Sequence, residues 1–330
     1  MNDRRKTLKT MAACGAAALS PLLAGRAAAQ TFPSKPVRVT TPFPPGSGPD
    51  SALRLVAEHL GKKWGQPVVI DNKPGGGGFI AVSQFKQGAT DGHDLIQLDS
   101  NHITTHPHTY KKLPYNVEAD FAPLGMILRT PFFVTVAADS PIKTIDDLIA
   151  KAKAKQDGVF YGSWFVGSPG HIGALQLQAL TGTRMIHVPF RDFGALYAAV
   201  ASKEVDWALG SIGSAGPLER AGRLRFIALA APGREPLYPA VPATSEVPSV
   251  RGFEVSGWTG LFAPAAAPAA VRARLAADIA DVLTNPTVAE RYRTFGYELP
   301  KMSPAEFTAL IRRETTSWRE VIAAANLTLD

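Results

Sequence analysis

Short apolar runs alternate with segments of helical spacing along the first 230 residues. The β-branched run at residues 37–41 predicts a strand, and the apolar positions between Ser51 and Leu60 recur at helical spacing. A stretch rich in proline and glycine separates the two. Since this order of strand, loop and helix repeats, the chain is predicted to form parallel sheets whose loops gather at one edge.

The repeats fall into two series, the second beginning after residue 130. The predicted strands are residues 37–41, 68–70, 95–98, 132–137, 159–161, 186–190, 205–209 and 225–230. The predicted helices in this part are residues 51–60, 79–87, 171–180, 195–202 and one that begins at the cap Thr144.

The last part of the chain has helical patterns only, at residues 268–283, 287–295 and 303–325. We expect these helices to pack on the first lobe. Lobe 1 would then comprise residues 30–130 and 254–330, lobe 2 residues 131–253, and the two chain crossings would form a hinge. The predicted fold is α/β with two lobes, each a mostly parallel sheet flanked by helices.

The first 29 residues have the organisation of an export signal. Basic residues including Arg4 and Arg5 precede an apolar run over residues 11–24, and Ala27-Ala28-Ala29 offers a cleavage site before Gln30. The run is shorter than the roughly 20 residues of a membrane span. Residues 4–9 resemble the twin-arginine export consensus, and the general secretory route stays open. We therefore expect a periplasmic protein that begins near Gln30.

Charge and cysteine content exclude several classes of protein. The chain has 35 basic and 28 acidic residues, but the predicted signal holds five of the basic ones, which leaves a small net charge and no basic stripe for nucleic acid. Cys14, the only cysteine, lies in the same segment. The exported protein would lack thiol chemistry and cysteine metal sites, and we predict no cofactor.

Two loops share a design that suits anion binding. Gly46-Ser47-Gly48-Pro49-Asp50 and Gly167-Ser168-Pro169-Gly170-His171 both precede predicted helices and combine small residues with a proline. Free backbone N–H groups at a helix start, with the positive end of the helix dipole, attract carboxylates. The alternative is that both loops are ordinary turns with Ser168 and Asp50 as caps. Their occurrence in both lobes favours a clamp around a small carboxylate.

Other candidate chemistry is weaker. Asn101 opens a segment with three histidines, but this segment has no metalloprotease pattern, and we expect a polar loop at the cleft edge without metal. His171 could donate to a carboxylate or simply pack. The catalytic motifs of hydrolases and the motifs of phosphate-binding loops are absent, which favours a binding protein over an enzyme. An α/β enzyme acting on a small carboxylate is the alternative.

An ordered series of segments resembles the Bug family, the solute receptors of tripartite tricarboxylate transporters. These segments are residues 32–37, 42–50, 65–75, 90–93, 113–115, 120–123, Gly167-Ser168 with His171, 188–191 and 257–264. The resemblance implies a type II-like periplasmic-binding-protein fold that closes like a flytrap. It implies ligands such as dicarboxylates, tricarboxylates, amino acids and aromatic acids, and delivery to membrane transporter subunits by a protein that we expect to be a monomer.

The resemblance also implies where the ligand lies. In such receptors a ligand carboxylate is held by the first-lobe loop, here Phe43 to Gly48 including Gly46 and Ser47, and by Gly167, Ser168 and His171 of the second lobe. Many contacts there go through backbone N–H groups and waters.

Some positions near the predicted cleft leave the ligand open. Pro49 stands where the family usually has threonine, and Asp192 follows Arg191 where glycine is usual. Asp192 could accept from a ligand, or pair with Arg191 and present it to a distal carboxylate. Four aromatic residues flank the cleft and would favour an aromatic or long ligand if two or more face it: Phe43, Trp164, Phe165 and Phe193.

Overall fold

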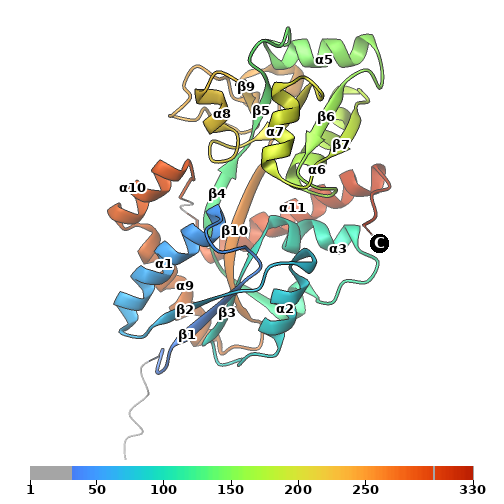
Figure 1. The fold of residues 1–330 in the computed structure, drawn as a ribbon. Coiled ribbons are helices and arrows are strands. Elements are labelled where there is room, and N and C mark those ends of the chain that lie inside the picture. Colours follow the sequence, from blue (N-terminus) through green and yellow to red (C-terminus); the bar gives the residue numbers. More distant parts are fainter. Residues whose placement is uncertain (1–31, 300–301, 330) are drawn as a thin grey trace, which may run out of the picture.

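Two five-stranded sheets, each flanked by helices, make up the computed structural model, which describes residues 32–299 and 302–329. The predicted export signal lies outside these residues. Figure 1 places the sheets at opposite ends of the molecule with β4 and β10 running between them. We call the part built on the first sheet lobe 1 and the part built on the second lobe 2. No helix in the described ranges is both long and apolar enough to cross a membrane.

The first sheet has the strand order β2-β1-β3-β10-β4. Its strands are β1 (Val37–Thr41), β2 (Val68–Asn72), β3 (Asp94–Asp99), β4 (Phe121–Pro131) and β10 (Ser256–Pro264). The strand β1 pairs in parallel with β2 and β3, whereas β10 is antiparallel to both of its neighbours. Four of the five strands therefore point the same way.

The second sheet repeats this plan in the order β7-β6-β8-β5-β9. Its strands are β5 (Phe133–Ala137), β6 (Phe160–Ser163), β7 (Ile186–Pro189), β8 (Trp207–Gly210) and β9 (Leu224–Leu229). Here β6 is parallel to β7 and β8, and β5 is the antiparallel strand. The predicted mostly parallel arrangement is thus right for both lobes, with one reversed strand in each.

Helices cover the sheets on both faces. They are α1 (Gly48–Trp64), α2 (Phe79–Lys86), α3 (His106–Thr109), α4 (Val117–Asp120), α5 (Ile145–Ala154), α6 (Pro169–Thr181), α7 (Phe193–Ala201), α8 (Gly216–Arg220), α9 (Ala269–Leu283), α10 (Pro286–Phe295) and α11 (Pro304–Ala324). Helices α9 and α10 pack against α1. Helix α11 packs on β4 and α3 and also reaches α6 of lobe 2.

Local signals set where the helices begin and end. Thr144 and Asp147 form a capping box at the start of α5, because each satisfies a backbone N–H group of the other. The helices α1, α6 and α10 end on Gly65, Gly182 and Gly296, all in the left-handed conformation that glycine adopts without a steric penalty.

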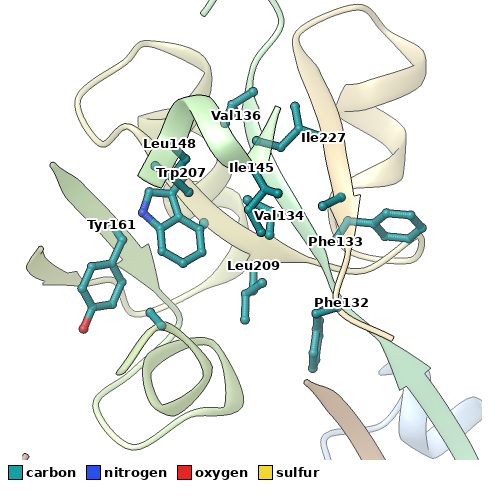
Figure 2. Packing of buried hydrophobic residues seen from close by; sticks show 14 of the residues in the cluster. Phe132, Phe133, Val134, Val136, Ile145, Leu148, Tyr161, Trp207, Leu209 and Ile227 are labelled. Carbon is teal, nitrogen blue, oxygen red and sulfur yellow. The ribbon is translucent and has the colours of Figure 1, made fainter. Parts of the chain in front are cut away.

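Each lobe has its own apolar core. In lobe 2, Ile145 and Leu148 of α5 lie beside Trp207 of β8 in the buried cluster shown in Figure 2. Lobe 1 has one cluster on each face of its sheet. A small fourth cluster joins Ile172 of α6 to Trp318 and Ile322 of α11, and so links the two lobes.

The strands β4 and β10, which carry the chain between the lobes, were missed by the sequence analysis. They pair along their length, from Ser256 opposite Pro131 to Pro264 opposite Phe121. Beyond this ladder, Phe132 N–H donates to Val255 O at 3.2 Å, so the two crossing segments stay bonded where they enter lobe 2.

The segment from Asn101 to Thr109 differs from the predicted polar loop. It forms a π-helical turn over Asn101–Thr105 that continues into α3, and most of its side chains are buried. Thr104 and Thr105 hydroxyls donate to the carbonyl oxygens four residues earlier. Because these threonines satisfy their own hydroxyl groups within the turn, a polar sequence is compatible with burial.

Candidate ligand-binding site

Asp50 organises the loop between β1 and α1. Its side chain is 1% exposed and accepts hydrogen bonds from Gly46 N–H at 2.7 Å, Asn72 Nδ2 at 2.7 Å and Arg54 Nε at 2.9 Å. Burial alone would raise the pKa of Asp50, but the hydrogen bonds from Arg54, Asn72 and Gly46 together lower it. Asn72 also donates to Phe43 O at 2.9 Å, so Asp50 holds Gly46 directly and Phe43 through Asn72.

The first turn of α1 is left with unused donors. Ser47 precedes the helix in an extended conformation, yet its hydroxyl makes no capping bond and is buried without a partner. Within the described residues, no hydrogen bond takes up the N–H groups of Gly48 and Asp50. A buried hydroxyl and two N–H groups therefore stand without acceptors at the positive end of a 17-residue helix.

In the matching loop of lobe 2, more of the hydrogen-bonding groups are bonded within the loop itself. Ser168 accepts from His171 N–H at 3.3 Å and so caps α6, and Gly167 N–H donates to His171 Nδ1 at 3.0 Å. Both Gly167 and Ser168 are buried. Of the N–H groups in α6's first turn, that of Gly170 has no partner in the described chain. The predicted backbone donors of Gly167 and His171 are therefore already used inside the loop.

The His171 ring belongs to a stack that crosses lobe 2. It lies on His187 with ring centroids 3.8 Å apart and planes 7° from parallel, and Tyr161 stacks on His187 in turn. Burial lowers the pKa of His171 to about 3, with a further contribution from His187, and burial lowers the pKa of His187 to about 4. A neutral His171 whose Nδ1 accepts from Gly167 carries its proton on Nε2.

This depressed pKa predicts a pH-dependent stability. The unfolded chain takes up a proton on His171 near pH 6.5 and the folded chain only near pH 3, so stability is lost as pH falls between these values. His171→Asn keeps an acceptor for Gly167 N–H but does not titrate. Between pH 7 and pH 5 we expect the wild type to lose about 1–2 kcal/mol more unfolding free energy than the variant in urea titrations. Equal losses would show that His171 is not held neutral.

The aromatic residues near the predicted cleft divide into buried and exposed rings. Trp164 is 8% exposed and packs between Phe132 and Phe193, with ring centroids 5.3 and 5.1 Å away. Its indole also lies against Gly170, where a Cβ atom would come within 2.6 Å of it. Phe165 and Phe193 are 46% and 42% exposed. Trp164 thus supports the loop, and the two phenylalanines present apolar surface.

Arg191 and Asp192 have separate roles. Asp192 Oδ1 accepts from Ala195 N–H at 2.8 Å and caps α7. Arg191 is exposed and makes no hydrogen bond or ion pair with any described residue. The pairing of Asp192 with Arg191 that the sequence left open is therefore not formed, and the guanidinium stays available.

Asn101 is buried in the π-helical turn, where its Oδ1 accepts from Thr105 Oγ1 at 3.4 Å. Phe43 is half-buried and Gly46 is exposed, with Gly46 in the left-handed region at a φ of 80°. Asn101 is thus engaged by its own helix, whereas the lobe 1 loop is open to solvent at Gly46.

Three site-related residues were missed by the sequence analysis. Asn72 ties the loop to β2, and Tyr297 lies so close to Gly48 that a Cβ atom there would be 1.8 Å from its hydroxyl oxygen. Leu329 lies against Gly167. Asn72 carried a weak signal, since it is a polar residue at the end of a strand. Tyr297 and Leu329 reach the loops from distant parts of the chain.

Histidine and carboxylate side chains also meet outside these loops. Asp99 Oδ1 accepts from His102 Nδ1 at 2.5 Å, and His102 Nε2 is buried against Gly78. Among the described residues, no group of three or more histidine, cysteine or acidic residues is arranged to hold a metal ion.

Comparison with known proteins identifies the family. Residues 52–327 match the family described as the tripartite tricarboxylate transporter family receptor, TctC. The chain belongs to this family. The TctC match covers most of both lobes, including α1 from Ala52 onward and all but the last residues of the C-terminal segment.

Relatives and solved structures agree with this assignment. The "UPF0065 protein in tcbD-tcbE intergenic region" of Pseudomonas sp. strain P51 is 29% identical over 90% of this chain and 88% of its own length. MatC (Rpa3494) from Rhodopseudomonas palustris with bound malate is 29% identical, with a TM-score of 0.73 over 88% of this chain and all of its own. R. palustris Rpa4515 with adipate is 27% identical, with a TM-score of 0.77 over 90% and 99% of the two chains.

These findings confirm the prediction of a Bug-type solute receptor with the two-lobed fold. TctC receptors are periplasmic proteins of carboxylate transport, and their solved relatives are binding proteins. The alternative prediction of an enzyme finds no support among them.

Proposed function

We propose that this TctC receptor holds a ligand carboxylate at the N-terminus of α1 and closes lobe 2 over it. The single observation that carries the assignment is the set of unused donors there, the Ser47 hydroxyl with the N–H groups of Gly48 and Asp50. Gly170 N–H at the start of α6 is the corresponding donor in lobe 2. A carboxylate between them would satisfy all four groups.

The rest of the ligand is proposed to be apolar and to end in a second acidic group. Exposed Phe165 and Phe193 border the start of α6 and α7, and Arg191 is a cation without a partner among the described residues. An Arg191 guanidinium can hold a carboxylate through two hydrogen bonds. This combination favours dicarboxylates with a hydrocarbon body, of the kind that adipate represents in its complex with Rpa4515.

The same proposal covers the protein's cellular context. The chain would be exported, cleaved near Gln30, act as a monomer and deliver its ligand unchanged to membrane subunits of a tripartite transporter. Lobe 1 would comprise residues 30–130 and 254–330 and lobe 2 residues 131–253, with closure about the paired segments at Pro131 and Ser256.

The two N-cap serines provide a test, because they occupy equivalent positions with opposite bonding. Ser47→Ala removes an unpartnered hydroxyl, so we expect unchanged unfolding free energy and about 0.5–1.5 kcal/mol weaker binding of a carboxylate probe. Ser168→Ala removes a capping bond and should lower stability by about 1 kcal/mol. Calorimetric titration with adipate and with malate, together with urea unfolding, measures both.

The outcomes separate the proposal from a purely structural role for the loop. Binding of either dicarboxylate to the wild type, weakened in Ser47→Ala at constant stability, supports the anion site at α1. If Ser47→Ala destabilises the protein and leaves binding intact, Ser47 is only part of a turn. Recovery of chemically altered ligand after long incubation would contradict binding without conversion.

A further inference from the structure

The C-terminal segment after α11 crosses from lobe 1 to the binding loop of lobe 2. The chain leaves α11 at Ala325, and Leu329 N–H donates to the carbonyl oxygen of Thr109 at the end of α3 at 2.8 Å. In Figure 1 this segment lies beside α3 at the end of α11. The backbone of the segment is therefore fixed to lobe 1.

The side chain of Leu329 instead contacts lobe 2. A Cβ atom built on Gly167 would lie 3.2 Å from Leu329 Cδ1 and 3.7 Å from Cδ2, so the leucine methyl groups cover the Cα of this glycine. Gly167 is buried although it lies in a loop between β6 and α6. Its N–H group donates to His171 Nδ1, so the residue that Leu329 covers is also the one that orders the loop.

A second contact holds the same part of lobe 2. Trp318 and Ile322 of α11 bury Ile172 of α6, and Val321 and Leu327 pack against this cluster. Ile172 is four residues after Ser168, and its N–H group donates to Ser168 O at 2.9 Å. The end of α11 and the segment after it thus contact the first turn of α6 and the loop before it.

We propose that residues 327–329 form a strap from lobe 1 that positions the Gly167 loop of lobe 2 for the ligand, with Leu329 as the positioning residue. Gly167 adopts a φ of 83°, and because glycine has access to many other backbone conformations, contacts from neighbouring residues are needed to hold the loop in this one. Leu329 supplies an apolar cover, and Gly167 N–H then keeps its bond to His171. Pre-ordering the loop lowers the entropy that must be lost when a ligand binds.

The strap also links the two lobes through the site. The N–H group of Leu329 is bonded to Thr109 of lobe 1, and its side chain contacts Gly167 in the loop next to Gly170, whose N–H group is free within the described chain. Movement of lobe 2 relative to lobe 1 must therefore move Leu329 against Gly167. This part of the inference rests on the proposed binding site, whereas the ordering of the loop does not.

Amide hydrogen exchange tests the strap without any ligand. Leu329→Ala keeps the backbone bond to Thr109 but removes the methyl groups over Gly167. We expect peptides covering residues 164–172 to exchange at least fivefold faster, with unchanged exchange in β1, β3 and β9. Thr328→Ala, at an exposed neighbouring position, serves as the matched control and should exchange like the wild type.

A second measurement addresses binding. With adipate or malate as the probe, whichever binds the wild type, Leu329→Ala should raise the dissociation rate constant severalfold and leave the unfolding midpoint within about one degree. Unchanged exchange at residues 164–172 would overturn the strap, whether or not either probe binds. Faster exchange with no binding of either probe to the wild type would uphold the strap and contradict the proposed ligand class.

Discussion

Gly167→Val is expected to weaken carboxylate binding at least tenfold while the protein stays folded. Valine disfavours the left-handed φ of 83° that this position requires, and its Cβ would press on Leu329 at 3.2 Å. Relief of both conflicts moves the loop and breaks the bond from Gly167 N–H to His171 Nδ1. We expect at least a tenfold loss of affinity in calorimetric titration, since strain of this kind amounts to about 1–3 kcal/mol.

Gly182→Val is a matched control for this substitution. Gly182 ends the same helix in the left-handed region at a φ of 66°, and no atom lies within 4 Å of the position that a Cβ atom would take there. It should reproduce the backbone strain and leave binding unchanged. Circular dichroism reports folding for both variants. Normal affinity in folded Gly167→Val would show that the Gly167 loop is only a turn.

Asp50→Ala is expected to destabilise lobe 1 and to eliminate binding. The substitution leaves Gly46 N–H, Asn72 and Arg54 without the acceptor that they share in the first turn of α1. Breaking these hydrogen bonds to a buried carboxylate should lower the unfolding free energy by about 2–4 kcal/mol, with Arg54 at 50% exposure recovering part of its hydration. Urea unfolding measures this loss.

The same helix offers a control with identical spacing. Glu58 and Lys62 form an ion pair four residues apart on α1, as Asp50 and Arg54 do, but both of their side chains are more than half exposed. Glu58→Ala should change stability little, because solvent screens an exposed pair. Similar stability of Asp50→Ala and Glu58→Ala would contradict the role of Asp50 as the organiser of the loop.

The sequence predicted most of the regular elements because local patterns decide them. The strand at residues 37–41 and the Thr144 cap were predicted at the positions that the structure shows. The strand β4 was missed because its residues, Phe121–Pro131, are buried on both sides and include two prolines and a glycine, so they show neither alternation nor typical strand composition. The segment Asn101–Thr109 was wrongly predicted as a polar loop, because its threonine hydroxyls donate to carbonyl oxygens of the same turn and can therefore be buried.

The sequence indicated which two loops hold candidate donors. It could not indicate which of these donors are hydrogen-bonded in the fold. Both loops contain Ser and Pro at a helix start, yet Ser168 caps its helix and Ser47 does not. The difference depends on atoms placed by tertiary structure, such as the Asp50 carboxylate at Gly46 and the His171 ring at Gly167. Contacts from Tyr297 and Leu329 come from more than 150 residues away and leave no local pattern.

The position of β10 between β3 and β4 has a consequence for how the protein acquires its structure. Among the strands of the described residues β10 is the sheet neighbour of β4, and β3 has β10 on one side, so lobe 1 cannot complete its sheet until residues 256–264 have emerged. Lobe 2, whose strands all lie between residues 133 and 229, needs no later segment for its sheet. Until then the strands within residues 37–131 have open edges, which are prone to pair with other chains. A chain that ends just before residue 256 would contain every strand of the lobe 2 sheet but would lack the strand that completes the lobe 1 sheet.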